Sequence, residues 1–322
     1  MKSDVEVSVL VTFYNQEKCV DVALQSIMNQ VVTFDYEVLV GDDGSSDNTR
    51  ARIDGWVEKY PSIIKCFSWP RNQKIKYEAV LRASNNRLGL LAEAKGKYVV
   101  FLDGDDYFTD NSKLQLQYNA LQNNPECGSC CHNFSYVDIA DSNTVISNCS
   151  LRDGIVQFHD YWRNEYIHAE CFMFRTPSSE AFLNIKKWKN FDDCNIVYFL
   201  ARENPIIYLN RSMVNYVQEE TGSWLGRPVD DRNIISLVDY FLELEVDSSF
   251  EQVSTYRHSS ELIWLLRGGY LKLKSHIAYK KLLTYSQFRV FEKKYLKDSI
   301  LGRIHRVVLL FEIYLKVLFG KL

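Results

Sequence analysis

Three carboxylates follow a short apolar run in the first half of the chain. Residues 98–102 lack polar alternation, a pattern typical of a strand buried on both faces of a parallel sheet. Asp103, Asp105 and Asp106 then crowd around Gly104. Carboxylates this close repel one another unless a cation or hydrogen-bond donors hold them, and hard cations such as Mg²⁺ and Mn²⁺ prefer oxygen ligands. The triplet therefore indicates a divalent-metal site, with a polar Asp-Gly turn as the alternative.

A second acidic loop comes earlier in the chain. Asp42 and Asp43 follow the strand-like residues 36–40 and open a polar segment that leads into a helix. An Asp at the end of a parallel strand can accept hydrogen bonds from a base or a ribose. Helix capping by Ser45 or Asp47 is the alternative role for this loop.

The elements that must position these loops alternate regularly. Because strands that alternate with helices predict a parallel sheet with right-handed crossovers, we expect an α/β fold with a Rossmann-like sheet. Both acidic loops would then lie at one sheet edge and could meet across one crevice. The sequence contains neither a Gly-x-Gly-x-x-Gly nor a Walker-type motif, so dinucleotide redox and P-loop chemistry are not expected. The expected strands cover residues 5–13, 36–40, 65–69 and 98–102, and the expected helices cover residues 20–28, a segment from 49 to about 61 and one ending near 94.

Composition narrows the function classes. The 322 residues are 46% hydrophobic and 25% charged, as in ordinary globular proteins, and the formal net charge of −3 argues against a nucleic-acid partner. The eight cysteines are scattered, so buried reduced thiols and a cytoplasmic location are expected. Cys127, Cys130 and Cys131 could alternatively begin a metal site. No signal-peptide pattern and no apolar run of membrane-spanning length is evident.

Several motifs, in order along residues 5 to 225, resemble the GT-A type family-2 glycosyltransferases of bacterial polysaccharide synthesis. They are VSVLVTFYNQE at 7–17, ALQSIMNQ at 23–30, DDGSSDNT at 42–49, Asn86, the Asp-x-Asp at 103–105, FDD at 191–193, Tyr216 and GSW at 222–224. The resemblance implies a GT-A domain over residues 1–227 and an inverting, metal-dependent transfer from a nucleotide diphosphate sugar, expected to be a UDP-sugar.

The resemblance also implies roles for individual residues. Asp103 and Asp105 would bind Mn²⁺ or Mg²⁺, and Asp193, or alternatively Asp192, would take the proton of the acceptor hydroxyl as general base. An acidic first turn of the helix expected over residues 195–203 is the alternative for these two. Tyr14 would stack on the base, although simple core packing is equally open. The implied nucleotide contacts are Thr12, Tyr14, Glu17, Asp43, Asn86 and Gly104.

One departure concerns the charge that meets the diphosphate. Members of the family it resembles often carry a basic residue directly after the tyrosine that corresponds to Tyr216, and a histidine further along. This chain has Val217 and Glu219 instead, so Arg211, Arg227 or basic residues of the tail would have to balance the charge of the phosphates. A nucleotidyltransferase acting on sugar phosphates and a non-catalytic sugar-binding protein of the same fold remain alternatives.

The acceptor side is expected between the triplet and the end of the domain. Segments 130–137 and 170–175 read as strands, so His168 and Glu170 would point to one face, and with Trp224 they could contact a saccharide or lipid-linked acceptor. Either pair member could instead be an ordinary structural hydrogen-bond partner.

The last region, residues 228–322, is expected to be helical and basic. From residue 250 onward it carries 14 Lys and Arg against 5 Asp and Glu, and residues 300–322 form an amphipathic pattern flanked by basic residues. Such a helix could lie on the inner face of the plasma membrane or pack against protein. The sequence does not identify the sugar, the acceptor, the linkage or the oligomeric state.

Overall fold

The computed structural model describes residues 5–71, 79–138, 144–147, 149–158, 160–161, 167–186, 191 and 193–218. Asp192, Trp224, Glu219, Arg227 and the expected helix at 300–322 lie outside these residues, so the boundary at 227/228 and the membrane contact stay predictions. Within the described residues, no helix combines the length and apolarity needed to cross a bilayer.

The first hundred residues form the alternating elements that the sequence predicts. Apolar residues fill β1, where five of the seven residues are buried aliphatics or Phe, and Val20, Ala23, Leu24 and Ile27 form the buried face of α1 at helical spacing. The elements are β1 (Val7–Phe13), α1 (Val20–Met28), β2 (Tyr36–Asp42), α2 (Thr49–Lys59), β3 (Ile64–Ser68), α3 (Ala79–Glu93) and β4 (Tyr98–Asp103).

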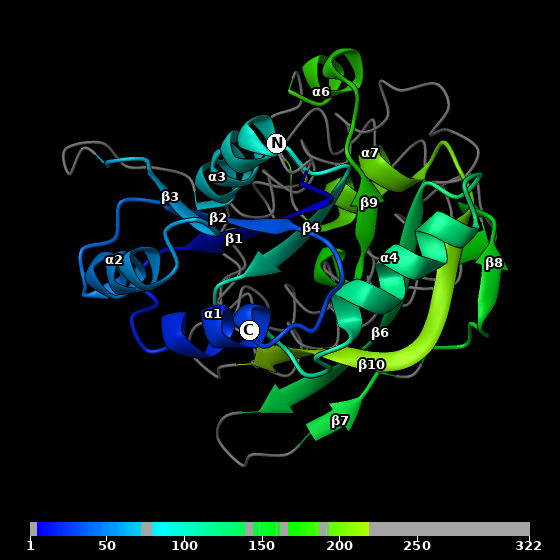
Figure 1. Ribbon diagram of the computed structural model, residues 1–322, viewed down its shortest axis with the longest axis horizontal. Coiled ribbons are helices and arrows are strands. Elements are labelled where there is room, and N and C mark those ends of the chain that lie inside the picture. The colour runs from blue at the N-terminus through cyan, green and yellow to red at the C-terminus, as the bar shows by residue number, and fades with distance from the viewer. Residues whose placement is uncertain are drawn as a thin grey trace, which may run out of the picture. The chain divides into compact units, whose positions relative to one another are not determined.

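These four strands are all parallel and lie in the order β3-β2-β1-β4. The chain runs outward through β1, β2 and β3 and then returns to the other side of β1. Because each crossover is right-handed, this reversal moves α3 to the face opposite α1 and α2, as Figure 1 shows. The reversal creates a switch point between β1 and β4, where α/β sheets bind their ligands.

The second half extends the same sheet with mixed pairing. The described strands continue in the order β4-β9-β6-β10-β5, with β7 on β6 and β8 on β10. The long strand β10 bends along the sheet (Figure 1), and its residues Val214 and Asn215 pair with β5. The bounds are β5 (Tyr107–Phe108), α4 (Lys113–Asn123), β6 (Ser129–Asp138), β7 (Thr144–Ile146), β8 (Gly154–Val156), β9 (Met173–Arg175), α6 (Ser179–Ile185), α7 (Asp193–Ala201) and β10 (Ile206–Gln218).

The strand predicted over 170–175 is wrong in its first half. Ala169–Cys171 form a 3₁₀ turn, η1, and only Met173–Arg175 form a strand. A short apolar run fits a buried turn as well as a buried strand, and here the chain turns before it joins the sheet. His168 and Glu170 therefore do not share a strand face.

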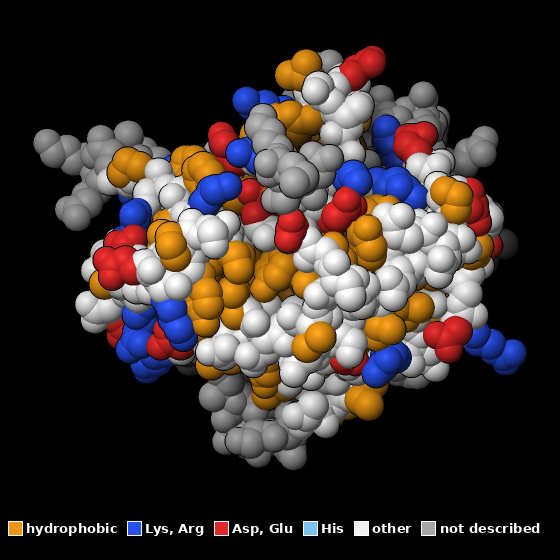
Figure 2. Space-filling model, in the orientation of Figure 1, with side chains coloured by type: hydrophobic (Ala, Val, Ile, Leu, Met, Phe, Trp, Pro, Cys, Tyr) orange, Lys and Arg blue, Asp and Glu red, His pale blue; other side chains and the backbone are white. Residues whose placement is uncertain are grey.

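The cysteines are free thiols in the described residues. Cys127, Cys130, Cys131 and Cys171 are buried, and burial raises the pKa of Cys130 to about 12. The prediction of buried thiols is confirmed for these four cysteines. On the face in Figure 2, acidic and basic side chains intermix around a strip of hydrophobic ones, so no large field of a single sign is visible there.

Candidate active site at the carboxyl ends of the parallel strands

Strand register brings the predicted loops to one level. Thr12 of β1 lies opposite Gly41 of β2 on one side and opposite Asp103 of β4 on the other. Backbone hydrogen bonds continue past the strand ends, because the Asp43 amide donates to Phe13 O at 3.0 Å and the Gly104 amide donates to Thr12 O at 2.9 Å. The prediction that both acidic loops meet at one sheet edge is confirmed.

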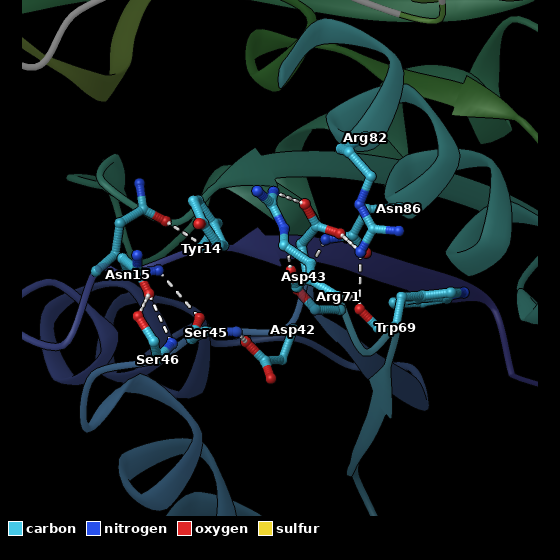
Figure 3. A network of polar contacts seen from close by, with 12 residues as sticks. Tyr14, Asn15, Asp42, Asp43, Ser45, Ser46, Trp69, Arg71, Arg82 and Asn86 are labelled. Atoms are coloured by element: carbon cyan, nitrogen blue, oxygen red, sulfur yellow. Dashed lines mark hydrogen bonds and ion pairs between the residues drawn. The ribbon is translucent and has the colours of Figure 1, made fainter. Parts of the chain in front are cut away.

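Side-chain hydrogen bonds connect the β1–α1 loop with the β2–α2 loop (Figure 3). Asn15, in the left-handed region at φ 52°, accepts a hydrogen bond from the Ser46 amide at 2.8 Å through its Oδ1. Its own amide donates to Ser45 Oγ at 3.0 Å. Glu17 accepts from the Asn48 amide at 3.0 Å, so this predicted nucleotide contact also holds the loop.

The capping alternative for the second loop is partly right. Asp47 accepts a hydrogen bond from the Thr49 amide at 3.0 Å at the start of α2, whereas Ser45 binds the neighbouring loop instead. Asp42 accepts from the Ser45 amide at 3.1 Å and forms a local turn. These contacts leave Asp43 as the carboxylate of this loop that faces α3 and the segment after β3.

Asp43 is held by two arginines that the sequence reading missed. Arg71 and Arg82 both form ion pairs with its buried carboxylate, and Arg71 Nε also donates to Asp43 O at 2.8 Å. The Arg71 guanidinium carbon lies 3.5 Å from the centre of the Tyr14 ring. Tyr14 is 42% exposed, so the core-packing alternative for it is wrong. Figure 3 shows these groups converging at the sheet edge.

Asp103 is held in the same way by a third arginine. Arg87 on α3 donates to both carboxylate oxygens, at 2.7 and 2.6 Å, and Thr12 Oγ1 donates to Oδ1 at 3.0 Å. Asp105, two residues on, is exposed. The repulsion expected within the triplet is therefore relieved at Asp103 by a guanidinium.

Two glycines permit the close packing around these side chains. A Cβ on Gly104 would lie 2.2 Å from Phe13 Cδ1, so only glycine lets the triplet fold back onto β1. A Cβ on Gly41 would lie 1.9 Å from Asn86 Oδ1. Asn86 Nδ2 donates to Gly41 O at 3.0 Å, which fixes α3 against β2.

The remaining member of the triplet turns inward, toward β10. Asp106 accepts a hydrogen bond from the Val217 amide at 2.7 Å and is hydrogen-bonded to Glu170. Burial, and next the charge of Asp105, raises the pKa of Asp106 well above its ordinary value. His168 stacks on Tyr216 with ring centres 4.3 Å apart. His168 and Glu170 are thus brought to the acidic loop, but both are buried, and their acceptor contact stays a prediction.

The segment predicted to carry the general base begins next to β4. The Phe191 amide donates to Ser84 Oγ on α3 at 2.8 Å, and the Phe191 ring packs edge-on against Phe101 of β4 at 5.9 Å. Helix α7 starts at Asp193, two residues later. This placement agrees with the acidic helix start that the sequence offers as the alternative, and it is equally compatible with a base at the crevice.

The structure shows further positive charge beside the candidate site. Arg211, one of the residues predicted to balance the phosphates, pairs with Asp110 at 2.9 Å, while Arg227 and the tail lie outside the described residues. Arg71, Arg82 and Arg87 contact the two acidic loops. The spacing of Arg82 and Asn86, four apart on one helix face and followed directly by Arg87, could have indicated a polar helix face. It could not have shown which carboxylate each arginine contacts, because the arginine side chain is long.

A family model described as "Glycosyl transferase family 2" matches residues 8–183, which is more than half of the chain. The chain belongs to glycosyl transferase family 2. The match begins within β1 and ends within α6, so it includes both acidic loops and all three arginines.

Curated relatives of this family-2 chain match less than half of its length. An uncharacterised Mycobacterium tuberculosis protein is 32% identical over 130 residues, 39% of this chain and 34% of its own length. The Escherichia coli protein WfgD, named as a UDP-Glc:alpha-D-GlcNAc-diphosphoundecaprenol beta-1,3-glucosyltransferase, is 32% identical over 121 residues, 38% of this chain and 43% of its own. The matched segment thus spans less than half the length of these relatives.

Solved structures share the fold of this family-2 chain. Staphylococcus aureus TarS 1-349, in complex with UDP-GlcNAc, superposes with a TM-score of 0.56 at 19% identity and covers 88% of this chain and 78% of that one. The Pyrobaculum calidifontis mannosyltransferase PcManGT, in complex with GDP-Man and Mn²⁺, gives 0.50 at 18% identity over 96% and 90%. The predicted GT-A fold is therefore confirmed.

The donor set at the triplet can be tested against a divalent metal. No group of three or more His, Cys, Asp or Glu side chains that could hold an ion occurs within the described ranges. Mg²⁺ and similar ions, however, commonly bind one or two carboxylates together with substrate phosphates and water. Asp103 and Asp105 fit that pattern, in which the substrate completes the ligand shell, and they do not fit a cage of protein ligands alone.

Proposed function

We propose that this chain is an inverting glycosyltransferase that transfers a sugar from a nucleotide diphosphate donor, a UDP-sugar, to a hydroxyl of a saccharide or lipid-linked acceptor during cell-surface polysaccharide synthesis. The observation that carries the proposal is the meeting of Thr12, Asp43 and Asp103 at the switch point of a family-2 fold. Open α/β sheets bind ligands at this edge.

The donor would bind across the two acidic loops. Tyr14 offers an exposed aromatic face to the base, and the buried Asp43 carboxylate offers hydrogen-bond acceptors beside it. Asp103 and Asp105 would hold a divalent ion, Mn²⁺ or Mg²⁺, which as a Lewis acid neutralises charge on the leaving diphosphate. Glu17, Asn86 and Gly104 would keep the loops in place.

Asp193 is the proposed general base. The acceptor hydroxyl is a poor nucleophile near neutral pH, so a carboxylate that takes its proton in the transition state accelerates attack on the anomeric carbon. Attack opposite the leaving diphosphate inverts the configuration there. The anchoring of Phe191 to Ser84 and Phe101 supports this role, because it holds the start of α7 beside α3 and β4.

The acceptor class and the location are proposed from a relative and from the charge of the C-terminal region. WfgD, by its name, acts on a diphosphoundecaprenol-linked sugar, and the basic region beyond residue 250 would suit an enzyme that works at the inner membrane surface. We therefore propose a cytoplasmic enzyme that is peripheral on the plasma membrane.

Donor hydrolysis tests the proposal most directly. The full chain is incubated with a panel of UDP- and GDP-sugars, with Mn²⁺, with Mg²⁺ or with EDTA, and release of the nucleoside diphosphate is measured. We expect UDP release from one UDP-sugar that depends on the divalent ion. Release of pyrophosphate from a sugar phosphate and UTP would instead indicate a nucleotidyltransferase, and inactivity with every donor and ion would reject the proposal.

Asp193→Asn tests the general base. Transfer should fall at least about a hundredfold, the usual contribution of such a group, while UDP binding persists. Asn184→Asp on α6 provides a charge-changing control outside the crevice, and its transfer rate should match the wild type. Unchanged transfer by Asp193→Asn would remove Asp193 from the mechanism, and loss of UDP binding in the same variant would point to a structural role.

A further inference from the structure

The Arg87–Asp103 pair places a permanent positive charge on the proposed metal ligand. The guanidinium contacts both carboxylate oxygens, at 2.7 and 2.6 Å, and the Arg87 side chain is only 10% exposed. Arginine does not lose its proton in proteins, so this charge is present at every working pH. Both contacts come from one guanidinium nitrogen, Nη2, which makes a charge-assisted hydrogen bond shared between the two carboxylate oxygens.

A divalent ion on Asp103 would therefore have to approach a fixed cation. Repulsion between charges in a partly buried site is screened less than in water, so the ion alone should bind poorly. A nucleotide diphosphate alters this balance, because its negative oxygens attract the metal and the guanidinium together. The positive charge that the resemblance places directly after Tyr216, to meet the diphosphate, is replaced by Val217 in this chain. Arg211 forms an ion pair with Asp110.

We propose that Arg87 is a donor-positioning residue that makes metal binding at Asp103 depend on the nucleotide diphosphate. Without donor, Arg87 holds Asp103 and disfavours the ion; with donor, its charge turns to the diphosphate and the carboxylate receives the ion. The inference rests on the proposed function, since it needs both a metal and a diphosphate.

The backbone around Arg87 favours a side-chain movement over a helix movement. Asn86 Nδ2 is bonded to Gly41 O at 3.0 Å, and Ser84 Oγ accepts the Phe191 amide at 2.8 Å. These contacts fix α3 on both sides of the crevice. The long arginine side chain can exchange one oxyanion for another while its Cα stays in place.

The test compares three probes on four full-length proteins. The probes are Mn²⁺ alone, uridine, and UDP at saturating Mn²⁺, each titrated by calorimetry, with saturation-transfer NMR for uridine. The proteins are the wild type, Arg87→Gln, Arg87→Lys and the control Arg52→Gln. Arg52 pairs with Asp21 at 2.7 Å on the surface, and both side chains are about half exposed.

Opposite shifts are expected for the two charged probes. Arg87→Gln should bind Mn²⁺ alone about fivefold tighter, or more, and UDP with Mn²⁺ about tenfold weaker, within the usual range of coupling between sites. Uridine binding should stay unchanged because uridine carries no phosphate. Arg87→Lys keeps the charge but places it on a shorter side chain with a compact ammonium, so it should shift both affinities in the same directions by less. Arg52→Gln should match the wild type.

Other outcomes overturn the inference. Unchanged or weaker Mn²⁺ binding by both Arg87 variants would mean that Arg87 only supports the loop, and unchanged UDP binding would mean that it does not meet the diphosphate. If Arg87→Gln does not fold, Arg87→Lys alone decides between these results. If the wild type binds neither uridine nor UDP, the proposed function is overturned as well. If the wild type binds UDP and the Arg87 variants bind UDP and Mn²⁺ with the same affinities, only the role of Arg87 is overturned.

Discussion

Replacing Lys113 with methionine tests the cost of a charge buried near the candidate site. Lys113 lies on α4 and is fully buried, its ammonium donates to Gln117 Oε1 at 2.9 Å, and it lies 4.3 Å from the centre of the Phe108 ring. Burial lowers the pKa of Lys113 from 10.5 to about 8, although Cys171, Cys130 and Glu170 partly oppose this effect. Methionine has a similar shape and carries no charge, so the variant removes the titration and keeps most of the packing.

The size and sign follow from proton linkage. A tenfold change in proton affinity corresponds to about 1.4 kcal/mol, so charged Lys113 lowers the free energy of unfolding by about 3 kcal/mol at pH 7 relative to a neutral side chain. Between pH 8 and 10.5 the unfolded chain binds more protons than the folded protein, and stability from this group rises with pH. At pH 10 the lowering of the free energy of unfolding by Lys113 has fallen to about 1 kcal/mol.

The assay is urea unfolding of the wild type and Lys113→Met at pH 7, 8, 9 and 10, followed by circular dichroism. Loss of the ammonium leaves Gln117 Oε1 without this donor at a cost of about 1–3 kcal/mol, which does not depend on pH. The difference between the two proteins should therefore move by about 2 kcal/mol in favour of the wild type from pH 7 to pH 10. Tyrosines and thiols that do not interact with Lys113 affect both proteins alike.

Lys97→Met is the matched control. The Lys97 side chain is 60% exposed and its ammonium pairs with Glu6 at 2.6 Å, so its difference from the wild type should stay flat over the same range. A flat difference for Lys113→Met as well would refute the reasoning, because it would mean that the ammonium is not desolvated in the folded protein.

Two further changes probe the crevice. Gly104→Ala would place a Cβ 2.2 Å from Phe13 Cδ1 and should lower the free energy of unfolding by about 1–3 kcal/mol, measured by urea unfolding. Gly55→Ala on α2, where a Cβ meets nothing within 4 Å, should be neutral or stabilising, and equal effects of the two would contradict the argument. Asp103→Asn should cost about 2 kcal/mol because it removes the carboxylate charge that the largely buried Arg87 guanidinium contacts, and the double variant with Arg87→Gln should recover part of that loss. Strictly additive losses in this cycle would show that the pair is not coupled.

The parallel half of the fold and its acidic loops could be predicted because local patterns determine them. The continuous apolar run before Asp103 predicts a strand that is buried on both faces and has a neighbouring strand on each side. Strand β4 does lie between β1 and β9. The end of that run then fixes where the carboxylates emerge. The loop before Thr49 could also be predicted, because turn and capping residues form hydrogen bonds with the backbone next to them in the sequence.

The counter-charges and the acceptor side could not be predicted from such patterns. Arg71 and Arg82 reach Asp43 across 28 and 39 positions of sequence, so their pairing depends on how the segment after β3 and the helix α3 pack against the sheet. The strand predicted over 170–175 begins too early, because Glu170 and Cys171 belong to a turn and the apolar residues from Cys171 onward suit either conformation. Both failures concern tertiary contacts that override local preference.

The register of β1 with its two neighbours has an evolutionary consequence. Main-chain ladders set the level at which Thr12, Gly41 and Asp103 emerge, and such ladders make almost no demand on side-chain identity. The fold can therefore be shared where few residues are, as in TarS at 19% identity. Selection is then free to rework the arginines and loops around the crevice, which is where differences between descendants of this scaffold should accumulate.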